Sequence, residues 1–257
     1  MQISNILKAD ENINIQKPVK QGNLLKLLEE EDDDIPWQVV IRNAPRGLLM
    51  FGSRAITDSL PTPDNLAKWG KITGSSCKIC KMSPCTLGHI LNNCPISLQQ
   101  GRFTLRHNLI LKFLVSKLKD QNLKEYEIYS DLKEHNICGG SIPPHILVSE
   151  QKPDIFIINK TKKYCMVIEL TCPFDARINI DKARERKLKR YFNLQADLSK
   201  NYKCDLITLE ICSRGYIDKE NCSRLTLICK IFQIKHIRDI IVTLSKLGLI
   251  GSKIIYN

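Results

Sequence analysis

The chain has 257 residues, of which 43% are hydrophobic and 26% charged, a balance that supports a folded core and argues against residence in a membrane. No run approaches the roughly 18 apolar residues of a spanning helix, and the first residues lack the apolar centre of a secretory signal. The net charge of +12 is unevenly placed, because residues 71–257 hold 31 of the 39 Lys and Arg but only 17 of the 27 Asp and Glu. This basic field fits a polyanionic partner, and a merely soluble basic protein is the alternative.

Residues 1–59 read as a peripheral N-terminal extension. Six consecutive acids from Glu29 to Asp34 repel one another, so this stretch is expected to be a solvated acidic linker. A segment that competes with nucleic acid for the basic part of the chain is the alternative interpretation.

The stretch CKICKMSPCTLGHILNNC, residues 77–94, has the spacing of a metal site. The chain has eleven cysteines and no secretory signal, which favours reduced thiols over disulfides. Three thiolates and one imidazole can close a tetrahedral Zn²⁺ site with no open position, which is typical of a structural site. The predicted ligands are Cys77, Cys80, His89 and Cys94. Cys85 is a fifth candidate, and buried cysteines without a metal are the alternative.

A helix is predicted within GRFTLRHNLILKFLVSKLKDQN, residues 101–122, where apolar side chains recur at helical spacing. The predicted apolar stripe consists of Leu109, Phe113, Leu114 and Leu118. Arg102, Arg106 and His107 lie near the start of this helix, where positive side chains and free backbone N–H groups can meet phosphate. A capping or packing role is the alternative for His107.

The stretch KPDIFIINKTKKYCMVIELTCPFD, residues 152–175, predicts two short apolar strands joined by a turn. Asp154 opens the first strand and Glu169 lies near the end of the second, where an acid is costly to bury without a cationic partner. A hairpin would return Glu169 beside Asp154. Two carboxylates brought together in this way form an oxygen-ligand site of the kind that Mg²⁺ or Mn²⁺ prefers.

A second long helix is predicted from about Asp181 to Ser199. Its apolar stripe consists of Ala183, Tyr191, Leu194 and Leu198. Lys187 falls within this stripe and Arg190 lies at its margin, so Lys187 needs a partner, and the two carboxylates are its natural partners. A lysine that reaches past Tyr191 to the surface is the alternative.

A third strand is predicted in KCDLITLEICSRGY, residues 203–216, and a helical tail over residues 221–247 is expected to cover the sheet. The order strand, strand, helix, strand, helix predicts an α/β fold with a mixed or partly parallel sheet.

These elements resemble the PD-(D/E)XK restriction-like nucleases, through Pro153-Asp154 and Glu169-Leu170-Thr171. Thr171 stands where the usual lysine would be. One branch, the endonuclease of site-specific non-LTR retrotransposons, carries the lysine in a K-x-x-[KR]-Y element on the following helix, and KLKRY at residues 187–191 is similar. That branch also has a CCHC knuckle followed by a G-R-x-T-x-R-H-[ND] element, which GRFTLRHN at residues 101–108 matches.

The resemblance implies a restriction-like α/β domain over residues 101–257, preceded by a linker and zinc knuckle over residues 60–100. It further implies Mg²⁺-dependent nicking of double-stranded DNA in the nucleus, with Asp154, Glu169 and Lys187 as catalytic residues and the element's RNA as a further partner. Arg102, Arg106, His107 and Arg190 would bind nucleic acid. Because 59 residues precede the match, we expect a truncated copy, a fragmentary gene or a host gene derived from such an element.

Two other functions are compatible with the sequence. A domesticated nucleic-acid-binding protein would keep the fold and the zinc knuckle without cleaving DNA. A structural zinc protein would carry these carboxylates as ordinary strand ends.

Overall fold

The computed structural model describes residues 27, 39–40, 42–132 and 142–257. The predicted acidic linker, Glu29 to Asp34, lies outside the described residues. No described helix is both long and apolar enough to cross a lipid bilayer.

A four-stranded mixed sheet forms the centre of the fold, with the order β1-β2-β3-β4. The strands are β1 (Glu127–Ser130), β2 (Ile155–Asn159), β3 (Tyr164–Thr171) and β4 (Lys203–Glu210). Strand β2 pairs antiparallel with both β1 and β3, whereas β3 and β4 are parallel and are joined through helix α8 (Arg177–Leu198). The expected α/β fold with a mixed sheet is therefore confirmed.

Strand β1 is the one strand among the described residues that the sequence did not predict. It has four residues, EIYS, of which three are only half-buried. A strand of four residues that begins with a charged residue shows too little alternation of apolar and polar side chains to be distinguished from a loop.

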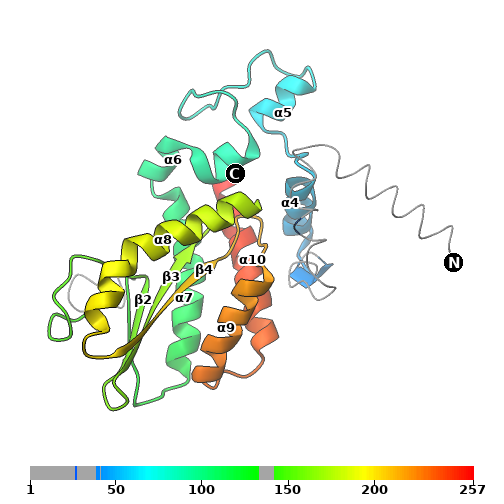
Figure 1. Ribbon diagram of the computed structural model, residues 1–257. Helices are drawn as coiled ribbons and strands as arrows, with labels where there is room; N and C mark the ends of the chain where they lie inside the picture. The colour runs from blue at the N-terminus through cyan, green and yellow to red at the C-terminus, as the bar shows by residue number, and fades with distance from the viewer. Residues whose placement is uncertain (1–26, 28–38, 41, 133–141) are drawn as a thin grey trace, which may run out of the picture.

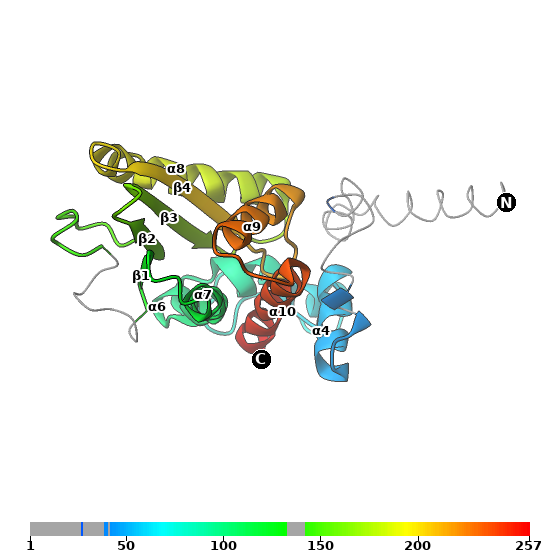
Figure 2. The same cartoon turned by 90° about the horizontal axis from the view of Figure 1, so that it is seen from below.

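Helices cover both faces of the sheet (Figures 1 and 2). Successive side chains of β2 and β3 pack into the two layers in turn. One face packs beneath α8, where Phe156, Ile158, Cys165 and Val167 meet Tyr191, Leu194 and Leu198. The other face packs against α7 (Arg102–Asp120), α9 (Lys219–Ile231) and α10 (Ile237–Tyr256). The stripe predicted for α8 is therefore the face that it buries.

The buried face of α7 differs from the predicted one. Its buried side chains are Arg106, Ile110, Leu111, Leu114, Val115 and Leu118, while Leu109 and Phe113 are only half-buried. Helix α7 packs against β1, β3 and α10, so its inward face is wider than one apolar stripe and includes an arginine.

A second core lies beside the sheet, where α10 also packs against the N-terminal half of the described chain. Helix α10 contacts α4 (Arg46–Ile56) and η1 (His89–Asn93) there, and α5 (Pro63–Lys68) and α6 (Pro95–Gln99) belong to the same half of the chain. Leu48, Phe51, Leu87 and Leu91 pack with Leu249 of α10 in this core. Helix α10 therefore belongs to both cores, and it connects the segment that contains the predicted zinc ligands, residues 77–94, to the sheet.

Candidate active site and metal centre

The backbone of the β2–β3 hairpin holds Asp154 and Glu169 side by side. Ile155 pairs with Ile168 in the antiparallel register, which places Asp154 opposite Glu169. The Asp154 N–H donates to Glu169 Oε1 (3.1 Å), and the Leu170 N–H donates to Asp154 Oδ2 (2.7 Å). Each carboxylate therefore accepts a hydrogen bond from the backbone next to the other.

Lys187 reaches both carboxylates from α8. Its Nζ donates to Glu169 Oε2 (2.5 Å) and to Asp154 Oδ2 (3.4 Å), and the lysine side chain is only 16% exposed. The predicted convergence of the three side chains is thus present, and Lys187 does not extend past Tyr191 to the surface. The lysine lies on the sheet side of α8 because Ala183, Tyr191 and Leu194 bury that face.

The two carboxyl groups have different protonation behaviour. Burial opposes ionisation of Asp154, but His107, Lys187 and the Leu170 N–H favour the anion and lower its pKa to about 2. Burial and the negative charge of Asp154 raise the pKa of Glu169 to about 7, against the opposing effect of Lys187. Near neutral pH, Asp154 is ionised and Glu169 is poised between its two forms.

His107 joins this cluster from α7. Its Nε2 lies 3.3 Å from Asp154 Oδ1, and its Nδ1 lies 3.0 Å from Asn108 Oδ1. Burial lowers the pKa of His107, but the hydrogen bond and charge of Asp154 outweigh burial and raise it above the ordinary value. The sequence predicted that His107 binds phosphate. Its contact with Asp154 could not be predicted from sequence spacing, because β1 and a long connection separate the two residues.

A cavity of about 810 Å³ opens beside the cluster, between α7 and α8. Asp154, His107 and Lys187 line it, whereas Glu169 lies behind them and is fully buried. Three exposed cations are also part of the lining, namely Lys112, Arg186 and Arg190. The cavity thus combines an ionised carboxylate in its wall with basic side chains along its rim, which suits a polyanion.

The other two arginines predicted to bind nucleic acid are placed differently, because Arg106 lies in the cavity wall but is buried, and Arg102 lies outside the cavity. Arg106 is 1% exposed, contrary to expectation, and its guanidinium donates to Leu91 O (3.1 Å), Ser252 Oγ (2.9 Å) and Cys172 O (3.2 Å). Because these acceptors belong to three separate segments, Arg106 holds the fold together. Arg102 is exposed, donates to Gln100 Oε1 (3.0 Å) and is not part of the cavity wall.

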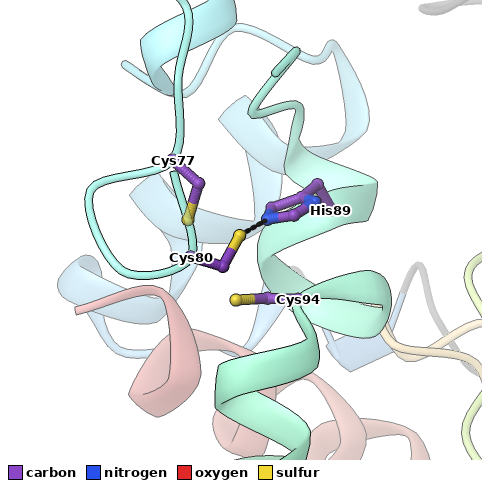
Figure 3. Close-up of side chains that lie close together, drawn as sticks. All are labelled: Cys77, Cys80, His89 and Cys94. Atoms are coloured by element: carbon purple, nitrogen blue, oxygen red, sulfur yellow. Dashed lines mark hydrogen bonds between the residues drawn. The ribbon is translucent and has the colours of Figure 1, made fainter. Parts of the chain in front are cut away.

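The cysteines predicted to bind zinc form a compact group. Ligand atoms of Cys77, Cys80, His89 and Cys94 all lie within 4.8 Å of one another, and their side chains point toward a common centre (Figure 3). Cys77 and Cys80 lie on one turn, His89 begins η1, and Cys94 precedes α6. This donor set and spacing can hold Zn²⁺.

Cys85 lies next to the group but is not a member of it. Burial and the neighbouring thiols raise the pKa of Cys85 to about 12. Burial also opposes ionisation of Cys77, but the N–H groups of Cys80 and Ile79 outweigh it and lower its pKa to about 6. The turn is therefore built to stabilise a thiolate at Cys77, as a metal ligand requires, and to keep Cys85 protonated.

Thr171 is a site residue whose structural context the sequence did not indicate. It lies two residues beyond Glu169 on the same strand, so both side chains face α8. Thr171 is 6% exposed, and its Oγ1 has no hydrogen-bond partner within the described parts of the chain. Thr171 also lines the cavity, together with Asp154 and Lys187.

The chain matches no protein-family model, and no curated protein is similar to it.

Proposed function

We propose that this protein is a metal-dependent phosphodiesterase that nicks double-stranded DNA, with an active site of the PD-(D/E)XK type. The observation that carries the proposal is the convergence of Asp154, Glu169 and Lys187 from β2, β3 and α8 at the wall of one cavity. The resemblance of the sequence to retrotransposon endonucleases supports the same activity, with a nuclear location and the element's RNA as a further partner.

The donor set suits a hard divalent cation, Mg²⁺ or Mn²⁺. Asp154 offers an ionised carboxylate at the cavity wall, and Glu169 supplies a second carboxylate behind it. When bound, such a cation would neutralise charge on the phosphate and make a water molecule more nucleophilic.

The chain's own residues supply the remaining requirements. Lys187 Nζ, held at the two carboxylates, provides a positive charge at the cavity wall where negative charge grows during phosphodiester cleavage. Lys112, Arg186 and Arg190 line the cavity and can hold backbone phosphates. Zinc held by Cys77, Cys80, His89 and Cys94 would have no open position, and its proposed role is to stabilise the knuckle and help it to bind nucleic acid.

The proposal is tested by incubating purified protein with supercoiled plasmid and Mg²⁺. We expect open-circular product from the native protein, and a loss of at least about 100-fold in nicking rate for Asp154→Ala, because the residual site lacks its ionised carboxylate. The matched control is Asp197→Ala, which removes an exposed aspartate of α8 that pairs with Lys200.

Nicking that persists in Asp154→Ala would reject the catalytic assignment. Retention of plasmid without nicking by the native protein would instead favour the domesticated nucleic-acid-binding protein.

A further inference from the structure

His107 and Asp154 face each other through groups that both attract a cation. Asp154 Oδ2 is occupied by the Leu170 N–H and Lys187, so Oδ1 is the oxygen that faces His107 Nε2 at 3.3 Å. When His107 Nδ1 donates its hydrogen to Asn108 Oδ1 (3.0 Å), a neutral His107 presents a lone pair at Nε2. Two lone pairs at this distance require a positive species between them, either a proton or a metal ion.

The separation suits two ligands of one metal ion. Metal–ligand bonds of about 2.1 Å place adjacent ligands of an octahedral ion about 3.0 Å apart. The observed 3.3 Å therefore needs only a small adjustment to admit a cation. The contact between Nδ1 and Asn108 is also the kind of hydrogen bond that orients a metal-binding histidine.

The surroundings favour a cation on this side of Asp154. Both His107 and Asp154 line the 810 Å³ cavity, so an ion can enter from solvent. Asp131, the residue after β1, lines the same cavity, and its backbone N–H donates to Asp154 O (3.1 Å). A second carboxylate thus adds negative charge next to the pair, while Lys187 is held on the opposite oxygen.

We propose that His107 is a direct metal ligand together with Asp154, which gives the site a nitrogen donor and a preference for Mn²⁺ over Mg²⁺. Imidazole nitrogen is a common ligand of first-row transition ions, whereas Mg²⁺ takes oxygen ligands. This inference deepens the proposed function and rests on it for the role of the metal.

The test is electron paramagnetic resonance of Mn²⁺ titrated into zinc-loaded protein. Zinc then occupies the site of Cys77, Cys80, His89 and Cys94, so His89 is not available as a ligand of Mn²⁺. We expect coupling of Mn²⁺ to an imidazole nitrogen in the native protein and its loss in His107→Ala, with affinity for Mn²⁺ at least about tenfold weaker. His145→Ala is the matched control, because His145 is exposed and does not line the cavity, and it should keep the coupling.

Circular dichroism and zinc content establish that each variant is folded. If His107→Ala does not fold, His107→Gln replaces it, since an amide can coordinate but gives no imidazole coupling. Failure of Mn²⁺ to bind, binding without nitrogen coupling, or coupling that survives in the His107 variant would overturn the assignment.

Plasmid nicking with Mg²⁺ is scored separately, so the two proposals can fail independently. Nitrogen-coupled Mn²⁺ without nicking would reject the nuclease and keep the ligand. Nicking by a protein whose Mn²⁺ shows no nitrogen coupling would keep the nuclease and reject His107 as a ligand.

Discussion

At the scale of residues, the site depends on one lysine shared between two acids. Glu169 is fully buried, and a buried carboxylate is stable only with hydrogen bonds and a cation, which the Asp154 N–H and Lys187 provide. The sequence indicated this partnership because an acid in an apolar strand and a lysine in an apolar helical stripe each needed the other. It did not indicate the partners of His107 and Arg106, because their contacts come from segments far apart in the chain.

The raised pKa of Glu169 predicts a pH-dependent contribution to stability. Because its pKa rises from 4.5 to about 7 on folding, the folded protein binds more protons than the unfolded chain between these values. The free energy of unfolding therefore falls as pH rises through this window, by at most about 1.4 kcal/mol per pH unit. Glu169→Gln removes this titration. We therefore expect the free energy of unfolding of the variant to rise relative to that of the native protein as pH increases from 5 to 7.

Urea denaturation of zinc-loaded protein without added Mg²⁺ or Mn²⁺ measures this difference. Parallel stability curves for the two proteins would contradict the shift. Asp154 titrates in a separate window, because its lowered pKa gives stability that is present above about pH 4 and lost as pH falls toward 2.

At the scale of elements, the lysine of the site comes from α8, whereas the strand position at which a lysine was expected, in β3, holds a threonine. Thr171 occupies the strand position next to Glu169 on the α8 face, and Lys187 supplies the ammonium from the helix. The sequence predicted β2, β3, β4 and α8 because their apolar patterns were long. It did not predict β1 or the orientation of α7, since a half-buried four-residue strand and a helix packed on two sides lack a single clear stripe.

Because residues 171 and 187 both line the cavity, we expect that a lysine at residue 171 can replace Lys187 in part. We expect Lys187→Ala to lower the nicking rate by at least about 100-fold, and the addition of Thr171→Lys to restore at least about tenfold, because residue 171 faces the same space. Plasmid nicking measures both variants. Thr171→Lys combined with intact Lys187 is the control, and a double variant no more active than Lys187→Ala would contradict the prediction.

The crossing of α7 and α10 depends on Gly251. A Cβ atom at Gly251 would lie 2.7–2.9 Å from the Cγ, Cβ and Cα atoms of Arg106, so a methyl group cannot be accommodated without moving a helix. We expect Gly251→Ala to lower the free energy of unfolding by about 1–3 kcal/mol, measured by urea denaturation. Gly74→Ala is the control, since a Cβ atom there meets nothing within 4 Å, and equal stability of the two variants would contradict the prediction.

At the scale of the whole molecule, α10 links the part that contains Cys77, Cys80, His89 and Cys94 to the sheet. Leu87 and Leu91 flank the metal ligands and share a core with Leu249 of α10, whereas the sheet has its own core on the other side of that helix. The sequence predicted both parts from their motifs. Their connection could not be read from it, because α10 is amphipathic on two faces and the Arg106 contacts join three segments.

We therefore expect zinc removal to act mainly on one part. A chelator should release a single equivalent of zinc and lower the melting temperature, while much of the far-UV signal of the sheet and its helices remains. Cys94→Ser should lose the zinc, and Cys222→Ser, which alters a cysteine outside the group, should keep it. Protein purified without zinc and unaffected by the chelator would contradict the metal centre.

The parallel crossover from β3 through α8 to β4 also has a consequence for the order in which the protein becomes active. The carboxylates are brought together by a local hairpin, but Lys187 reaches them only after α8 has packed on the sheet. Pairing of distant parallel strands is slow compared with hairpin formation. A nascent or partly folded chain thus holds two acids without their cation, and the proposed activity appears only once the crossover is complete.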